Sequence, residues 1–88
     1  MNAKAHLAFL HTLPCVVTYA LTGERVRAQV VHHPESVRDE NSHFAGIPML
    51  KWRHNELHRL SRRGFEARTK LSELDMLAIT MKLIQEGR

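Results

Sequence analysis

The stretch that decides the fold is Arg25-Val26-Arg27-Ala28-Gln29-Val30-Val31-His32-His33-Pro34. Apolar and polar side chains alternate over residues 25–31, which is the period of a β-strand with one buried face. Pro34 has no N–H to donate to a neighbouring strand, so the strand is expected to end just past His33. The sequence therefore predicts a strand that presents two adjacent histidines at its end.

The residues before this strand predict a β-hairpin. Residues 16–20, Val-Val-Thr-Tyr-Ala, are β-branched or aromatic in four of five positions, and such side chains favour strands. Thr22-Gly23-Glu24 supplies a turn between the two runs. Residues 3–13 carry apolar side chains at helical spacing and are followed by Pro14, so a short amphipathic helix is expected ahead of the hairpin.

The residues after the strand predict a loop and then a helix. Residues 35–46 are polar and irregular, and we expect them to form a loop over the site. Pro48 suits the first turn of a helix whose apolar positions continue to Leu60 and which Gly64 ends. Residues 65–70 predict a further helical turn.

The last part of the chain predicts a capped helix. Ser72-Glu73-Leu74-Asp75 approximates a capping box, and Gly87 follows the last periodic residue. The apolar stripe of this helix is Leu74, Leu77, Ala78, Met81, Leu83 and Ile84. A length of 88 residues fits one small domain, residues 1–88. The predicted fold is α+β, with an N-terminal helix, a β-hairpin and then two to three helices.

Histidines are frequent, at seven in 88 residues. His54 and His58 lie four residues apart on the predicted helix, so both point from one face, and His32 and His33 end the strand. Neutral imidazoles bind borderline transition metals, and an unbound imidazole can accept a proton near neutral pH. The arrangement indicates a metal-and-base site suited to phosphodiester hydrolysis. Scattered surface or capping histidines are the alternative, because this density gives each kind of pair by chance about half the time.

The charge of the chain favours a polyanionic partner. Thirteen Lys and Arg oppose nine Asp and Glu, giving a formal net charge of +4. The excess is concentrated in residues 51–70, and a basic stretch beside a site attracts nucleic acid. The residues predicted to contact nucleic acid are Lys51, Arg53, Arg59, Arg62 and Arg63. A solvated helical face is the alternative interpretation of such a run.

Cysteine usage and hydropathy indicate a cytoplasmic protein. Cys15 is the only cysteine, so the chain cannot form an internal disulfide, which suits a reducing compartment. The N-terminal residues lack the pattern of a signal peptide. No apolar run approaches the roughly 20 residues needed to span a bilayer, so no membrane association is expected.

In their order, these elements resemble the small phage and prophage HNH endonucleases, in particular the recombination-enhancement nuclease-like group. The motifs that carry the resemblance are His6-Leu7-Ala8-Phe9, Leu13-Pro14-Cys15-Val16-Val17, Val31-His32-His33-Pro34, Ser42-His43-Phe44-Ala45-Gly46-Ile47-Pro48-Met49-Leu50, Arg53-His54-Asn55-Glu56-Leu57-His58-Arg59, Arg63-Gly64-Phe65-Glu66-Ala67-Arg68 and the helix over residues 71–80. The resemblance covers nearly the whole chain. It implies a ββα-metal fold and metal-dependent cleavage of DNA.

The resemblance also implies a role for each site histidine. His33 matches the general base that activates water, and His32 matches the metal ligand that precedes it. His54 and His58 match the helix residues that complete the metal site. His43 falls near the residue that orients the base. One divalent metal ion is implied, and Mg, Mn, Ni, Co and Zn all remain open.

One feature of the family is missing from this sequence. Relatives commonly hold a structural zinc with four side chains, and this chain has Cys15, Thr18, Leu50 and Arg53 at those positions. A single thiolate cannot hold a tetrahedral zinc, so no structural zinc is expected. We expect apolar packing of Leu50 with Met49, Val17 and Trp52 to fill the space.

The sequence leaves two functions open, beside a purely structural interpretation in which the arrangement of the histidines is a coincidence. The leading hypothesis is a metal-dependent HNH endonuclease of phage or prophage origin that hydrolyses DNA phosphodiester bonds. The alternative is a non-catalytic protein of the same fold that binds nucleic acid or inhibits a host protein. The oligomeric state cannot be predicted.

Overall fold

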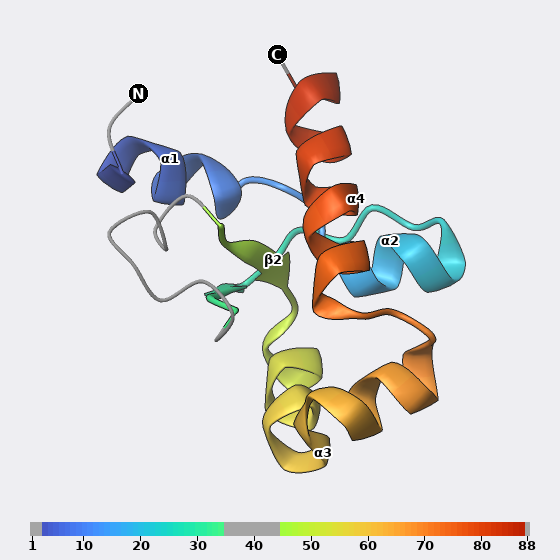
Figure 1. Ribbon diagram of the computed structural model, residues 1–88. Coiled ribbons are helices and arrows are strands. Elements are labelled where there is room, and N and C mark those ends of the chain that lie inside the picture. The colour runs from blue at the N-terminus through green and yellow to red at the C-terminus, as the bar shows by residue number, and fades with distance from the viewer. Residues whose placement is uncertain (1–2, 35–44, 88) are drawn as a thin grey trace.

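The chain folds as an α+β protein in the computed structural model, which describes residues 3–34 and 45–87. Within these residues a two-stranded antiparallel sheet lies among four helices (Figure 1). In chain order the elements are α1 (Ala3–Leu10), α2 (Val16–Thr22), β1 (Val30–His32), β2 (Ile47–Met49), α3 (Lys51–Thr69) and α4 (Glu73–Glu86). The predicted α+β class and the N-terminal helix are confirmed. None of the helices in the described part is long and apolar enough to cross a membrane.

The predicted hairpin is wrong in its first strand. β1 pairs with β2, which follows it in the sequence, and residues 16–20 belong to a helix instead. In the observed register Val31 lies opposite Pro48, and His32 lies opposite Ile47. A strand therefore ends at His32, but it comprises only Val30–His32 rather than residues 25–31, and its partner comes from the segment just before α3.

Gly46 allows the two strands to meet. A Cβ at this position would collide with Cγ1 of Val31 and would lie 2.8 Å from Cδ1 of Leu10. A larger residue would therefore have to shift the side chains of Val31, in β1, and Leu10, in α1.

Burial explains why the β-prone segment Val16–Thr22 is helical. The helix α2 places Val16 and Val17 in the core with no exposed surface, and such burial overrides a β-propensity that itself reflects packing. Gly23 adopts a left-handed conformation with φ of 78°, and its N–H donates to the carbonyl of Tyr19. Gly23 thus turns the chain as a helix cap rather than as a hairpin turn.

The chain segments on either side of α2 run antiparallel. The N–H of Cys15 donates to the carbonyl of Val26 over 2.7 Å, and the N–H of Ala28 donates to the carbonyl of Leu13 over 2.9 Å. Residues 13–15 thus pair with residues 26–28, whereas the expected strand over residues 16–20 is replaced by α2.

Helix α3 differs from its prediction at both ends. Pro48 lies in β2, where the edge of a small sheet tolerates a residue without an N–H. The helix does not end at Gly64, and the break lies at Ser61, with φ of 65° and ψ of 172°. It then continues to Thr69 and ends at Lys70, which is left-handed. α3 thus has a first segment before Ser61, which carries the histidines, and a second segment after it.

Helix α4 begins with the predicted capping box. Oγ of Ser72 accepts a hydrogen bond from the N–H of Asp75, and Oδ2 of Asp75 accepts one from the N–H of Ser72, each over 3.0 Å. The predicted apolar stripe is only partly buried. Leu83 is 2% exposed, but Leu74 and Met81 are 76% and 62% exposed.

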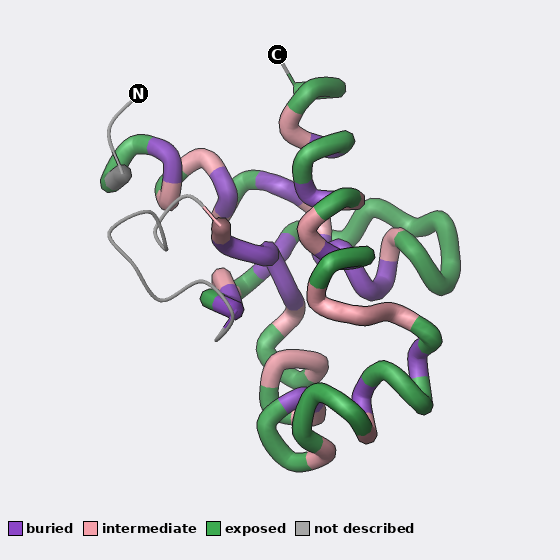
Figure 2. The backbone as a smooth tube through the Cα atoms, viewed as in Figure 1, coloured by how far each residue is buried: buried purple, intermediate pink, exposed green. Residues whose placement is uncertain are grey.

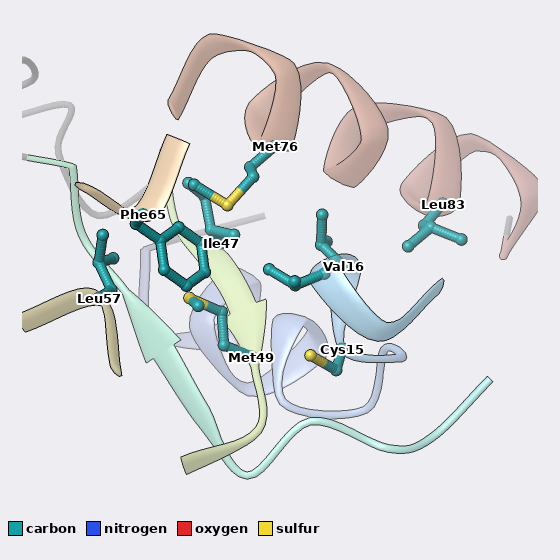
Figure 3. Packing of buried hydrophobic residues seen from close by; sticks show 9 residues of the cluster. Cys15, Val16, Ile47, Met49, Leu57, Phe65, Met76 and Leu83 are labelled. Carbon is teal, nitrogen blue, oxygen red and sulfur yellow. The ribbon is translucent and has the colours of Figure 1, made fainter. Parts of the chain in front are cut away.

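The core lies where α2, β2, α3 and α4 meet (Figures 2 and 3). Figure 3 shows Met76 of α4 reaching toward Ile47 of β2. Burying side chains of this size stabilises the fold by roughly 1.5–3 kcal/mol each. The buried cluster consists of Cys15, Val16, Val17, Ile47, Met49, Leu57, Phe65, Met76 and Leu83. This core fixes both segments of α3 against the sheet and α4, and it thereby sets the geometry of the site.

Candidate metal centre

His32 and His33 lie where β1 ends. The side chain of His32 is 9% exposed, whereas His33 is exposed. The end of β1 therefore offers one sheltered imidazole, on its last residue, and one accessible imidazole, on the residue that follows.

His54 and His58 lie one turn apart on the first segment of α3. Their Nε2 atoms are 3.2 Å apart, and their ring centroids are 4.4 Å apart in an edge-on arrangement. Two nitrogens bound to one zinc ion at about 2.0–2.1 Å in tetrahedral geometry are separated by about 3.3 Å. The observed distance is close to this value, and it is also that of a hydrogen bond between the two rings.

The three histidines predicted as metal ligands converge. One ligand atom each from His32, His54 and His58 lie within 4.8 Å of one another. The ring of His32 lies 5.2 Å from that of His54 and 6.2 Å from that of His58, centroid to centroid. A strand end and a helix face that are distant in sequence thus form a cluster that could hold a metal ion.

The surroundings of the cluster favour neutral imidazoles. Burial lowers the pKa of His32 below its usual value of 6.5, although the hydrogen bond and negative charge of Glu73 act in the opposite direction. Burial also lowers the pKa of His54, and the nearby imidazoles of His32, His58 and His33 lower it further. The neutral form is the one that binds a metal.

Glu73 is a member of the site that the sequence analysis missed. Its side chain is 10% exposed, and its Oε2 lies 3.1 Å from Nε2 of His32. Its other oxygen accepts a hydrogen bond from Arg62 over 3.2 Å. In the sequence, Glu73 stands out only as a residue within the predicted capping box, Ser72–Asp75. Because the contact joins positions 41 residues apart, no local spacing rule could have found it.

An open pocket of about 470 Å³ gives access to the cluster. It is lined by His32, His33, His54, Leu57, His58, Ser61, Arg62 and Glu73. The predicted general base, His33, is therefore at the same pocket as the predicted ligands. His43, predicted to orient the base, lies outside the described residues.

The predicted nucleic-acid-binding residues all lie on α3, but they differ in their surroundings. Lys51, Arg59 and Arg63 are exposed. Arg62 lines the pocket and donates a hydrogen bond to Glu73. Arg62 and Arg63 also line a second pocket of about 330 Å³. Arg53 is half-buried and turns toward α2.

Cys15, Thr18, Leu50 and Arg53, which stand where the resemblance implies zinc ligands, make other contacts. Nε of Arg53 donates to Oγ1 of Thr18 over 2.8 Å. Cys15 has no exposed surface, and Leu50 packs against the core, as expected. Trp52 was expected to fill this space, but it is 54% exposed and lies under the guanidinium of Arg53, 4.3 Å from ring centroid to Cζ.

Comparison of the chain with protein-family models, with curated proteins and with solved structures finds no match.

Proposed function

We propose that the protein is a metal-dependent endonuclease of the HNH type that hydrolyses DNA phosphodiester bonds. The observation that supports this most is the convergence of His32, His54 and His58, with His33 on the same pocket. The order β1, β2, α3 supports a ββα-metal unit, because the histidines stand at the end of its first strand and on its helix.

The residues of the site can divide the chemistry between them. His32, His54 and His58 would hold the metal ion, which when bound neutralises charge on the scissile phosphate and stabilises the leaving oxygen. His33 is accessible and stays outside this ligand set. Its imidazole can therefore take a proton from an attacking water molecule.

The exposed cations of α3 would hold the substrate. Lys51, Arg59 and Arg63 lie on the helix that carries His54 and His58. Their charges would contact backbone phosphates without regard to base sequence. DNA bound along this helix would have a phosphate close to the pocket.

A non-catalytic protein of the same fold is the second candidate. It is favoured by Thr18, Leu50 and Arg53, which stand where the family resemblance implies zinc ligands. Such a protein would bind nucleic acid or a host protein through the same basic helix.

Cleavage of supercoiled plasmid DNA tests the proposal. The protein is incubated with Mg²⁺, Mn²⁺, Ni²⁺, Co²⁺ or Zn²⁺ and, as a control, with a chelator. We expect the wild type to nick the plasmid with at least one of these ions and not with the chelator. The double variant His54→Ala, His58→Ala should not nick it under any condition. Binding of DNA without cleavage under every condition would favour the non-catalytic candidate.

A further inference from the structure

The carboxylate of Glu73 connects α4 to the histidine cluster. It belongs to the first residue of α4, and both of its oxygens have partners, Oε2 with His32 and Oε1 with Arg62. Only 10% of the Glu73 side chain is exposed. A buried charge is costly unless its partners compensate it, so this carboxylate is held in one orientation.

The contact with Glu73 determines which nitrogen of His32 carries a proton. An ionised carboxylate can only accept hydrogen bonds, so Nε2 of His32 must be the donor over the 3.1 Å between them. In the neutral imidazole the other nitrogen, Nδ1, then holds the lone pair. Nδ1 is therefore the nitrogen of His32 that is available to a metal ion.

His54 and His58 use the other ring nitrogen, Nε2, at the cluster. The Nε2 atoms of His54 and His58 face each other over 3.2 Å. Two lone pairs cannot face each other so closely unless a proton or a cation lies between them. The ligand cluster comprises His32, His54 and His58 without Glu73, so the carboxylate stands behind His32 rather than among the ligands.

We propose that Glu73 is a positioning residue of the metal centre, which fixes the Nε2–H tautomer of His32 and directs its Nδ1 to the metal. This inference rests on the proposed metal-binding function. His54 and His58 bind through Nε2, so the centre has a mixed ligand set of one Nδ1 and two Nε2 nitrogens. Hydrogen-bonded carboxylates behind metal-binding histidines typically contribute tenfold to a hundredfold in metal affinity.

Arg62 and the break at Ser61 complete this support. Arg62 directly follows Ser61, where the helical geometry of α3 is interrupted. Its guanidinium donates a hydrogen bond to Oε1 of Glu73. A glutamine at position 73 replaces one of the two acceptor oxygens with an NH2 donor, so in the same orientation it faces either His32 or Arg62 with a donor instead of an acceptor. Glu73→Gln therefore breaks the connection at nearly constant volume.

The experiment compares the wild type with Glu73→Gln and with the control Glu56→Gln, using Zn²⁺ as the probe. Glu56 also lies in a partly buried position beside an arginine, 3.8 Å from Arg68, but has no histidine partner among the residues that the structure describes. Calorimetry measures the zinc affinity, and long-range ¹H–¹⁵N correlation spectra assign the protonated nitrogen of each imidazole. We expect Glu73→Gln to bind zinc tenfold to a hundredfold more weakly and Glu56→Gln to bind it as the wild type does.

The spectra of the wild type test the inference even if the variant does not fold. The expected result is a protonated Nε2 and a zinc-bound Nδ1 on His32, with zinc-bound Nε2 on His54 and His58. Zinc bound through Nε2 of His32, or unchanged affinity in Glu73→Gln, would overturn the proposal. If the wild type binds no metal ion, the proposed function fails. The metal-free spectrum then still decides the role of Glu73, because it either shows the Nε2–H tautomer of His32 or does not.

Discussion

Arg53 of α3 donates a hydrogen bond to the hydroxyl of Thr18 of α2 over 2.8 Å. Both residues stand where the resemblance to HNH endonucleases implies zinc ligands. Thr18 is 5% exposed, and the neighbouring Cys15 is fully buried. A charge-assisted hydrogen bond thus joins α2 to α3 at these positions.

We predict that this hydrogen bond stabilises the fold. Thr18→Val keeps the shape of the side chain and removes the acceptor, so it should lower the free energy of unfolding by about 1.5–3 kcal/mol, as is usual for a hydrogen bond to a charged group. Urea denaturation of Thr18→Val, Arg53→Met and the double variant measures the coupling between them. Strictly additive effects would show that the contact contributes nothing.

We predict that any stoichiometric zinc is held by the histidine cluster and not by Cys15. His58→Ala removes one of three ligands and should abolish tight zinc binding, whereas Cys15→Ala should leave one zinc ion per chain. Elemental analysis after dialysis against zinc measures both. A zinc ion that is absent from Cys15→Ala and present in His58→Ala would place the metal at Cys15 instead.

The metal-free protein should lose stability as the pH falls below 6.5. The pKa values of His32 and His54 are lowered in the folded state, chiefly by burial. Between the lowered pKa values of the folded state and the usual value of 6.5, the unfolded chain binds more protons than the folded chain. The free energy of unfolding therefore rises with pH through this window and reaches its full value above it. Urea denaturation in the presence of a chelator measures the profile, and the double variant His32→Gln, His54→Gln should flatten it. A wild-type profile that is already flat would contradict the prediction.

The parts of the site that sequence could predict are those that local rules govern. His54 and His58 share a helix face because they are four residues apart, and the Ser72–Asp75 capping box forms within four residues. A strand end near His32 was also predicted from Pro34, but the alternating pattern over residues 25–31 indicated a longer strand than the observed Val30–His32.

The parts that sequence could not predict depend on tertiary contacts. The segment Val16–Thr22 has strand-forming residues, but burial against the core makes it a helix. β2 has only three residues and contains Pro48, so no periodic pattern marks it. The break at Ser61 and the contact of Glu73 with His32 likewise have no signature within a short window of sequence.

The exposed cations of α3 should provide most of the affinity for DNA. We predict that reversing the charges of Lys51, Arg59 and Arg63 weakens binding to all duplex sequences alike. The slope of log affinity against log salt should fall by about one for each phosphate that is no longer neutralised by a side chain. Fluorescence anisotropy over a salt series measures this slope. The control reverses the charges of Lys4 and Lys82, which are exposed on α1 and α4, and should change binding little; equal weakening in both variants would indicate a general charge effect.

His33 and His58 should contribute to cleavage in different ways. His33→Ala removes the proposed base but no metal ligand, so metal affinity should stay constant while the cleavage rate falls about a hundredfold to ten-thousandfold. His58→Ala removes a ligand, so metal affinity and rate should fall together, and excess metal should restore part of the rate. Plasmid cleavage and calorimetry on the same preparations separate the two effects. Cleavage that is unchanged in His33→Ala would place the base elsewhere, and weaker metal binding by that variant would make His33 a ligand.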